Sequence, residues 1–418
     1  MKIAVLKETR SGETRVAASP ETVKKYVALG ADVVVQAAAG ETARFSDADY
    51  TEAGAQISPS AADAAQGADV VLKVQAPSTE ELRVFGRGSK LIAILSPHGD
   101  PDALGSYARL GVDAFAMDLM PRITRAQSMD VLSSQSNLAG YKAVIDAGAY
   151  YGQALPMMMT AAGTIAPAKT FVMGAGVAGL QAIATARRLG AVVSATDVRF
   201  AAKEQVESLG ATFVTVDEEA MKEAETEGGY AKEMSEDFKK RQAEFVAEHI
   251  KKQDIVITTA LIPGRPAPKL VSEDMVAGMK PGSVIVDLAA EQGGNVALTR
   301  PGEAIEINGV TILGFFNVPG RLPADASSLY ARNVYNFIAA FWDKDAKTFA
   351  VDWDDDIIKG VALTRDGAVT HPQFAGENVE NASAPEPVDG EEVEAVEDAP
   401  ADAAEDTPED ASDETKDA

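Results

Sequence analysis

The stretch AKTFVMGAGVAGLQAIATARRLGAVVSATDVR, residues 168–199, decides the fold. An apolar strand at 170–173 leads into the motif GAGVAG, an amphipathic helix follows to residue 189, and a second strand ends at Asp197. A GxGxxG motif alone is a weak signal. One that follows a strand, opens a helix and has an acid at the end of the next strand indicates a dinucleotide-binding βαβ unit.

Each glycine of this motif has its own physical role. Gly174 permits a tight turn, Gly176 lets the backbone approach a pyrophosphate, and Gly179 lets the helix pack closely on the strand. Val177 stands inside the motif, where the start of the helix offers free N–H groups and a positive dipole end. We therefore predict that these four residues bind the cofactor.

The end of the second strand predicts which dinucleotide is bound. Asp197 can accept hydrogen bonds from a ribose 2′-hydroxyl, and its charge repels a 2′-phosphate. Arg199, two residues later, would instead favour NADP. Because Asp197 holds the strand-end position, we predict NAD(H) rather than NADP(H), with Asp197, Val198 and Arg199 as cofactor-binding residues.

Strands and helices alternate on both sides of this unit. Apolar runs such as KIAVLKE and DVVLKVQ alternate with amphipathic stretches, and a second series runs from residue 169 to TILGFFN. This alternation predicts an α/β protein with two doubly wound parallel-sheet (Rossmann-like) domains and a cleft between them. The first predicted domain is discontinuous (1–132 and 322–376, including the strand-like VALTRDGAV). The NAD-binding domain occupies 133–321.

The end of the chain differs in composition from the rest. From residue 377 onward, 17 acidic residues stand against one basic residue, so this segment carries most of the net charge of −26. It cannot bury enough apolar surface to offset the entropy of ordering it, and we predict a disordered acidic tail at 377–418. A solubilising tail and a docking arm both fit. The remaining body is mildly acidic, which argues against nucleic acid as a partner.

The composition excludes several other classes of site. The chain has 418 residues and no cysteine, which excludes disulfides and thiolate chemistry and fits a reducing compartment. The three histidines are far apart in the sequence, so we expect no metal site. No apolar run is long enough to span a bilayer, and the opening MKIAVLKETR is typical of a charged strand rather than a signal peptide.

A second informative stretch is RAQSMDVLSSQSNLAG at 125–140, which gathers serine, glutamine and asparagine with few strong acids or bases. On the residues alone, a polar helix cap and domain connector fits. With the dinucleotide motif, however, the chain resembles the NAD(H)-binding subunit (domain I) of proton-translocating NAD(P) transhydrogenase. The resemblance covers residues 1 to about 376. It rests on PRITRAQSMDVLSSQSNLAGYKAVIDA, PMMMTAAGT, GAGVAGLQAIATARRLGA, ATDVR, KEQVESLGA, GGYAKEM and TTALIPGRPAP.

The resemblance implies roles for the polar stretch. Arg122, Gln127, Asp130 and Ser133 would form a loop beside the nicotinamide. Arg122 would hold the carboxamide, Asp130 would orient Arg122 and Ser133, and Gln127 would reach toward a nucleotide on a partner. Direct hydride transfer between two rings needs alignment rather than a general base, which suits neutral side chains. We expect Ser134, Gln135 and Ser136 to be structural.

The resemblance also implies a mobile loop that closes over NAD(H), with Gly229 near the nucleotide and Tyr230 at the tip. Ala260 and Leu261 in TTALIPG would form an apolar floor beneath it. NADP(H) would be bound by a partner subunit, and further partners would span the membrane. The chain would be a homodimer on the cytoplasmic face of a bacterial plasma membrane. The whole complex would couple hydride transfer from NADH to NADP⁺ to proton translocation.

Two alternatives remain open. An alanine dehydrogenase would use Arg15 and Lys73, which match that family's substrate-binding arginine and lysine. Against it, Ser96 stands where that family has its catalytic histidine, with His98 two residues later, and Glu291 replaces its catalytic aspartate. The other alternative is a non-catalytic NAD(H)-sensing module, which would need no aligned nicotinamide and therefore no complete polar loop.

Overall fold

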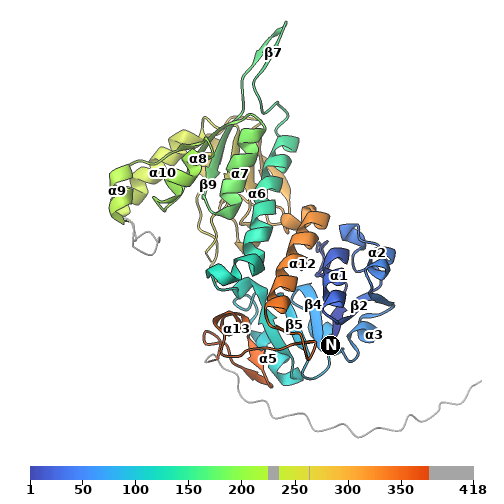
Figure 1. Ribbon diagram of the computed structural model, residues 1–418. Coiled ribbons are helices and arrows are strands. Elements are labelled where there is room, and N and C mark those ends of the chain that lie inside the picture. The colour runs from blue at the N-terminus through green and yellow to red at the C-terminus, as the bar shows by residue number, and fades with distance from the viewer. Residues whose placement is uncertain (225–234, 263, 376–418) are drawn as a thin grey trace, which may run out of the picture. The chain divides into compact units, whose positions relative to one another are not determined.

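The computed structural model describes residues 1–224, 235–262 and 264–375 (Figure 1). It contains two large sheets. The first is wholly parallel and has the order β3-β2-β1-β4-β5-β6. Its strands are β1 (Lys2–Val5), β2 (Asp32–Gln36), β3 (Gln56–Ser58), β4 (Val70–Gln75), β5 (Lys90–Ile94) and β6 (Asp113–Ala116).

Helices connect these strands, as parallel pairing requires. Their ends follow local chemistry. Ser19 caps α1 with Pro20 at its first position, and Gly111 ends α5 in a left-handed conformation with φ 67°. The connecting elements are α1 (Pro20–Ala28), η1 (Glu41–Ala43), α2 (Asp47–Glu52), α3 (Ala61–Ala65), α4 (Thr79–Leu82), α5 (Pro101–Leu110) and η2 (Met117–Leu119).

The second sheet has the order β11-β10-β9-β12-β13-β15-β14, with only β14 antiparallel to its neighbour. Two βαβ series diverge from β9 and β12, which is the arrangement of dinucleotide-binding folds. The predicted pair of doubly wound sheets is confirmed. Its strands are β9 (Lys169–Met173), β10 (Val192–Thr196), β11 (Thr212–Phe213), β12 (Ile255–Thr258), β13 (Val284–Asp287), β14 (Ala304–Ile307) and β15 (Val310–Leu313).

The connections of the second sheet are again mostly helical. They are α7 (Val177–Arg188), α8 (Ala202–Ser208), α9 (Glu218–Ala224), α10 (Glu236–Ile250), α11 (Glu273–Ala277) and η4 (Ala290–Gln292). Two elements precede this sheet, η3 (Thr124–Met129) and α6 (Val131–Tyr150).

The chain after the second sheet packs on the first. In α12 (Pro323–Ala340), Tyr330, Val334 and Phe337 belong to the same buried cluster as Leu72 and Phe115 (Figure 1). The discontinuous domain bounds themselves stay a prediction. The remaining elements are η5 (Pro319–Arg321), β16 (Trp342–Asp343), β17 (Thr348–Phe349), α13 (Asp356–Val361), β18 (Thr364–Arg365) and β19 (Ala368–Val369).

Two small hairpins differ from the sequence expectation. VALTRDGAV is not one strand, because Asp366 and Gly367 both have positive φ (50° and 84°) and turn the chain between β18 and β19. The other hairpin joins β7 (Met158–Thr160) to β8 (Gly163–Ile165) and was not predicted. All six of its strand residues are exposed, and it projects away from the second sheet (Figure 1).

Helix α6 takes part in both cores. Val131 at its start is buried in the cluster of the first sheet, whereas Ala143, Val144 and Ala147 are buried in that of the second. Within the described ranges, no helix combines the length and apolarity needed to cross a membrane.

Candidate nucleotide-binding site

The turn between β9 and α7 excludes side chains at two of its glycines. Gly174 has a φ of 105°, and a Cβ there would lie 2.5 Å from Thr259 Oγ1. A Cβ on Gly179 would lie 1.9 Å from the carbonyl oxygen of Gly174. The turn can therefore close, and α7 can lie on β9, only when both residues are glycine.

Gly176 differs from these two, because an added Cβ would have no atom within 4 Å. It is the N-cap of α7, and no side chain among the described residues caps the helix there. The first N–H groups of α7 are thus left without a side-chain acceptor beside an open space. Such a cradle at a helix N-terminus fits the pyrophosphate of a dinucleotide, which Gly176 and Val177 would hold.

Asp197 lies directly after β10 with 7% of its side chain exposed. Its Oδ2 accepts a hydrogen bond from Ala175 N (2.7 Å), which ties the carboxylate to the glycine turn. Its Oδ1 accepts from Arg199 N (2.8 Å), and Val198 between them is 75% exposed. The carboxylate therefore occupies the place where this fold binds the adenosine ribose.

The loop after β12 is held by an asparagine. Asn295 is wholly buried, its Nδ2 donates to Ala260 O (2.8 Å), and its Oδ1 accepts from Ala260 N (3.0 Å). Thr259 Oγ1 donates to Gly174 O (3.2 Å), and Leu261 is half-exposed. The loop that contains Ala260 and Leu261 is thus fixed beside the glycine turn. The sequence analysis missed Thr259 and Asn295.

The polar stretch forms η3 and the start of α6. Asp130 is the N-cap of α6: one carboxylate oxygen accepts from Ser133 N (2.9 Å) and the other from Ser133 Oγ (2.5 Å). Gln127 and Arg122 are exposed. No ion pair joins Arg122 to Asp130 in the described part of the chain, so only the Asp130–Ser133 half of the expected arrangement is present.

Two asparagines of α12 anchor this stretch. The Nδ2 groups of Asn333 and Asn336 both donate to Ser128 O (2.9 and 3.0 Å), and Asn333 Oδ1 accepts from Ser134 Oγ (2.7 Å). Gln135 is buried, where its amide group donates to Ala326 O (3.1 Å). Ser134 and Gln135 therefore have structural contacts, and Asn333 and Asn336 are positioning residues that the sequence analysis missed.

Helix α6 connects the polar stretch to the glycine turn. A Cβ on Gly140 would lie 2.0 Å from Ala178 O, so α6 touches the first turn of α7 directly. Asp130 precedes Gly140 by ten residues, which is about 15 Å along a helix. One rigid helix thus sets the separation between the Gln127 loop and the phosphate cradle. Two further predicted contact residues, Gly229 and Tyr230, lie outside the described residues.

The two cations that an amino-acid dehydrogenase would need are already paired. Arg15 is buried against Glu13, with Arg15 Nη2 donating to Glu13 Oε2 at 2.7 Å, and Arg15 Nη1 donates to Gln135 Oε1. Lys73 is buried and donates to Glu81 Oε1 (2.5 Å), and its Nζ lies 3.6 Å from Glu8 Oε2. Internal carboxylates therefore occupy the positions around both cations that a substrate carboxylate would need.

The other residues of that alternative also have structural partners. Ser96 has a φ of 45°, and its backbone N–H donates to Asp118 Oδ2 (3.0 Å). The exposed ring of His98 packs on Phe374, with ring centroids 5.0 Å apart. Glu291 Oε1 accepts from Asn317 N (2.5 Å).

One buried carboxyl in this cluster should make stability depend on pH. Burial raises the pKa of Glu8 from 4.5 to about 7, although the charge of Lys73 opposes this. The protonated form stabilises the fold fully below pH 4.5, and this contribution is lost as pH rises through 7. We expect Glu8→Gln to raise the free energy of unfolding at pH 8 by on the order of 1–3 kcal/mol, and to have little effect at pH 4.

Thermal melts at both pH values check this expectation. The matched control is Glu81→Gln, which removes the charged partner of Lys73 and should destabilise the protein at pH 8. A lower melting temperature for Glu8→Gln than for the wild type at pH 8 would contradict the argument.

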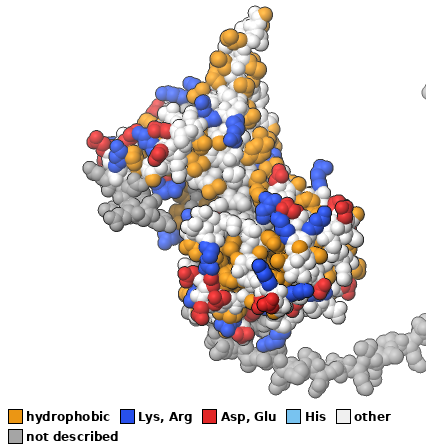
Figure 2. Space-filling view, in the orientation of Figure 1, with side chains coloured by type: hydrophobic (Ala, Val, Ile, Leu, Met, Phe, Trp, Pro, Cys, Tyr) orange, Lys and Arg blue, Asp and Glu red, His pale blue; other side chains and the backbone are white. Residues whose placement is uncertain are grey.

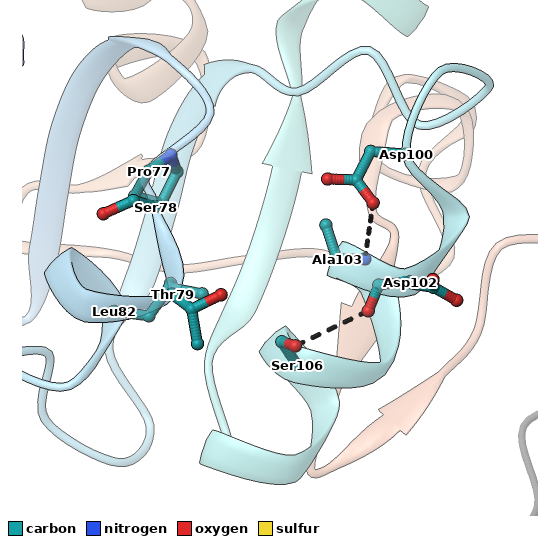
Figure 3. Close-up of a pocket in the computed structure, with 8 residues that line it drawn as sticks. All are labelled: Pro77, Ser78, Thr79, Leu82, Asp100, Asp102, Ala103 and Ser106. Atoms are coloured by element: carbon teal, nitrogen blue, oxygen red, sulfur yellow. Dashed lines mark hydrogen bonds between the residues drawn. The ribbon is translucent and has the colours of Figure 1, made fainter. Parts of the chain in front are cut away.

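A pocket between α4 and α5 is a different kind of site (Figure 3). It contains two carboxylates, of which Asp100 caps α5 by accepting from Ala103 N (3.2 Å). Carboxylates repel phosphate, so this pocket does not suit a dinucleotide. Its lining residues are Pro77, Ser78, Thr79, Leu82, Asp100, Asp102, Ala103 and Ser106.

Comparison with known proteins agrees with this geometry. The model of the alanine dehydrogenase/PNT N-terminal domain matches residues 4–139, and that of the C-terminal domain matches residues 143–372. The chain is 56% identical to an NAD(P) transhydrogenase alpha subunit of Rhodospirillum rubrum, over 90% of this chain and 100% of that protein. An alanine dehydrogenase of Halomonas elongata is 32% identical over 92% of this chain and 99% of its own length.

A solved structure gives the same result. The crystal structure of transhydrogenase from Sinorhizobium meliloti is 53% identical and superposes with a TM-score of 0.78, covering 90% of this chain and 100% of that one. The chain therefore belongs to the alanine dehydrogenase/PNT family and, within it, to the NAD(P) transhydrogenase alpha subunits, which are oxidoreductase subunits.

Proposed function

We propose that this chain binds NADH and passes hydride from it to NADP⁺ held by a partner subunit, in a complex that couples this reaction to proton translocation. The open cradle at Gly176 carries the proposal, since it joins a free helix N-terminus to a glycine turn that admits no side chain. The relatives named as transhydrogenase alpha subunits support the same reaction. The nicotinamide supplies the hydride.

The residues around the cradle support binding. Val177, Val198 and Leu261 expose 42%, 75% and 49% of their surface in the chain alone. Apolar side chains at a phosphate cradle are suited to pack against the rings and riboses of a dinucleotide. Asn295 holds the Leu261 side of this surface in place through Ala260.

The polar loop supports alignment rather than acid–base chemistry. Transfer between two nicotinamide rings removes no proton from a substrate, so the chain needs no general base. Asp130 is occupied by Ser133, whereas Gln127 stands exposed on a loop anchored by Asn333 and Asn336. Gln127 can therefore contact a nucleotide bound on a partner subunit, with Arg122 nearby in sequence to hold the carboxamide.

The test follows NADH absorbance in the purified chain under two conditions. One adds pyruvate and ammonium, and the other adds an NADP⁺ analogue with the NADP-binding domain of a transhydrogenase. We expect oxidation only in the second. Oxidation with an analogue of the NADP⁺ substrate also excludes a silent NAD(H) sensor, which would bind NADH without consuming it. Turnover in the first condition would instead identify an amino-acid dehydrogenase.

We further propose that the chain is a homodimer through the β7–β8 hairpin. Met157, Met158, Met159 and Ile165 expose 60%, 41%, 79% and 42% of their surface, and Figure 2 shows hydrophobic side chains on the projecting hairpin. A two-stranded hairpin with this much apolar surface is not stable in water by itself. A second copy of the chain would cover it.

A charge on the hairpin should separate such a dimer. We expect Met159→Asp to raise the dimer dissociation constant by roughly 100-fold, because a carboxylate would be buried without a partner. Sedimentation velocity measures the change, and Met159→Leu, which keeps the site apolar, should remain dimeric. A wild-type chain that sediments as a monomer would contradict the proposal.

A further inference from the structure

The carboxylate of Asp197 is fully occupied by the chain itself. Its Oδ2 accepts from Ala175 N (2.7 Å) and Arg199 Nη2 (3.2 Å). Its Oδ1 accepts from Arg199 N (2.8 Å) and Arg199 Nε (3.0 Å). A carboxylate has about four acceptor positions, so a ribose hydroxyl must share or displace one of these donors.

Arg199 is the donor that can give way. Its guanidinium is linked to Asp197 through Nε and Nη2, and Nη2 also donates to Ala175 O (3.2 Å) at the glycine turn. The side chain is 41% exposed, unlike the 7% of Asp197. The backbone N–H groups of Ala175 and Arg199 are fixed, whereas the guanidinium is held only by these side-chain contacts and lies partly in solvent.

The next cation along the chain is already committed. Lys203 on α8 pairs with Glu218 (2.6 Å) and lies 3.9 Å from Glu207. Loss of the Asp197 charge would therefore release Arg199 while leaving Lys203 neutralised. A guanidinium is the side chain best suited to bind phosphate through two hydrogen bonds.

We propose that Asp197 restrains Arg199, and that this pair sets the nucleotide specificity of the chain. The intact pair rejects a 2′-phosphate twice: the carboxylate repels it, and the one nearby guanidinium is already neutralised. Removing the carboxylate charge frees Arg199 to bind the 2′-phosphate and converts the site toward NADP(H). This inference rests on the nucleotide site of the proposed function.

Calorimetry with NADH and NADPH on the purified full chain tests the proposal, with no need for turnover. In Asp197→Asn, which keeps an acceptor for Ala175 N, we expect NADPH to bind about 10- to 100-fold more tightly, the size of one or two charge-assisted hydrogen bonds. NADH should bind roughly tenfold more weakly, because asparagine offers fewer acceptors. Adenosine 2′,5′-bisphosphate against adenosine 5′-monophosphate should reproduce the preference without the nicotinamide half.

The double variant Asp197→Asn/Arg199→Ala separates capture by arginine from relief of repulsion. We expect it to lose the gain in NADPH affinity, and a gain that survives would overturn the proposal. If Asp197→Asn does not fold, Asp197→Ser and its Arg199→Ala partner make the same comparison. A wild-type chain that binds neither dinucleotide would refute the nucleotide site itself, whereas a wild type that binds NADH beside variants that gain nothing would refute only the restraint of Arg199.

Discussion

Gly179→Ala should abolish detectable NADH binding and also destabilise the chain. The added Cβ would lie 1.9 Å from the carbonyl oxygen of Gly174, an atom of the backbone that cannot rotate away. Helix α7 must then move off β9, which shifts the cradle and overpacks the second core. We expect the free energy of unfolding to fall by about 1–3 kcal/mol. Calorimetric titration with NADH and a urea denaturation curve measure the two effects.

Gly176→Ala is the matched contrast. Its Cβ has open space around it, so this variant should unfold like the wild type but lose NADH affinity, since the methyl group enters the phosphate cradle. Gly86→Ala, where a Cβ also meets nothing within 4 Å and lies outside the site, should change neither property. If Gly179→Ala binds NADH normally, α7 does not hold the nucleotide.

The second large effect should come from Gln127→Asn, in the rate rather than in affinity. The shorter side chain keeps the amide but moves it back by one methylene, and a displacement of about 1 Å can slow an aligned reaction by about 100-fold. We expect hydride transfer to the partner's NADP⁺ analogue to fall by roughly that factor, whereas NADH affinity stays within about twofold of the wild type. Stopped-flow absorbance and calorimetry give the two numbers separately.

Ser136→Ala serves as the control for Gln127→Asn. It removes a hydroxyl from the same polar stretch, at a half-buried position to which we assign no role, and should leave rate and affinity unchanged. A parallel fall of rate and affinity in Gln127→Asn would show that Gln127 binds NADH rather than aligning the two rings.

The features of the site that the sequence could predict are local. Gly174, Gly176, Gly179 and Asp197 belong to one βαβ unit whose pattern is complete within 32 residues, so strand, turn, helix and acid could be identified together. The same reasoning gave two parallel sheets, because alternation of strands and helices leaves few other topologies.

The features that the sequence could not predict depend on distant pairs. Asn295 meets Ala260 across 35 residues, and Asn333 meets Ser128 across 205. No periodic pattern marks an asparagine that will satisfy a backbone group from another element. The β7–β8 hairpin was missed for a different reason. Its strands have three residues each and every one is exposed, so they lack the apolar alternation that identifies a strand.

Helix α6 has a consequence for how this chain can change over time. Adding one residue between Asp130 and Gly140 would rotate Gly140 by about 100° and advance it by 1.5 Å. A side chain would then face Ala178 O, and the Gln127 loop would no longer be in register with the phosphate cradle. Substitutions can accumulate on the outer face of this segment, but insertions and deletions cannot. Its length is therefore as much a feature of the site as any side chain.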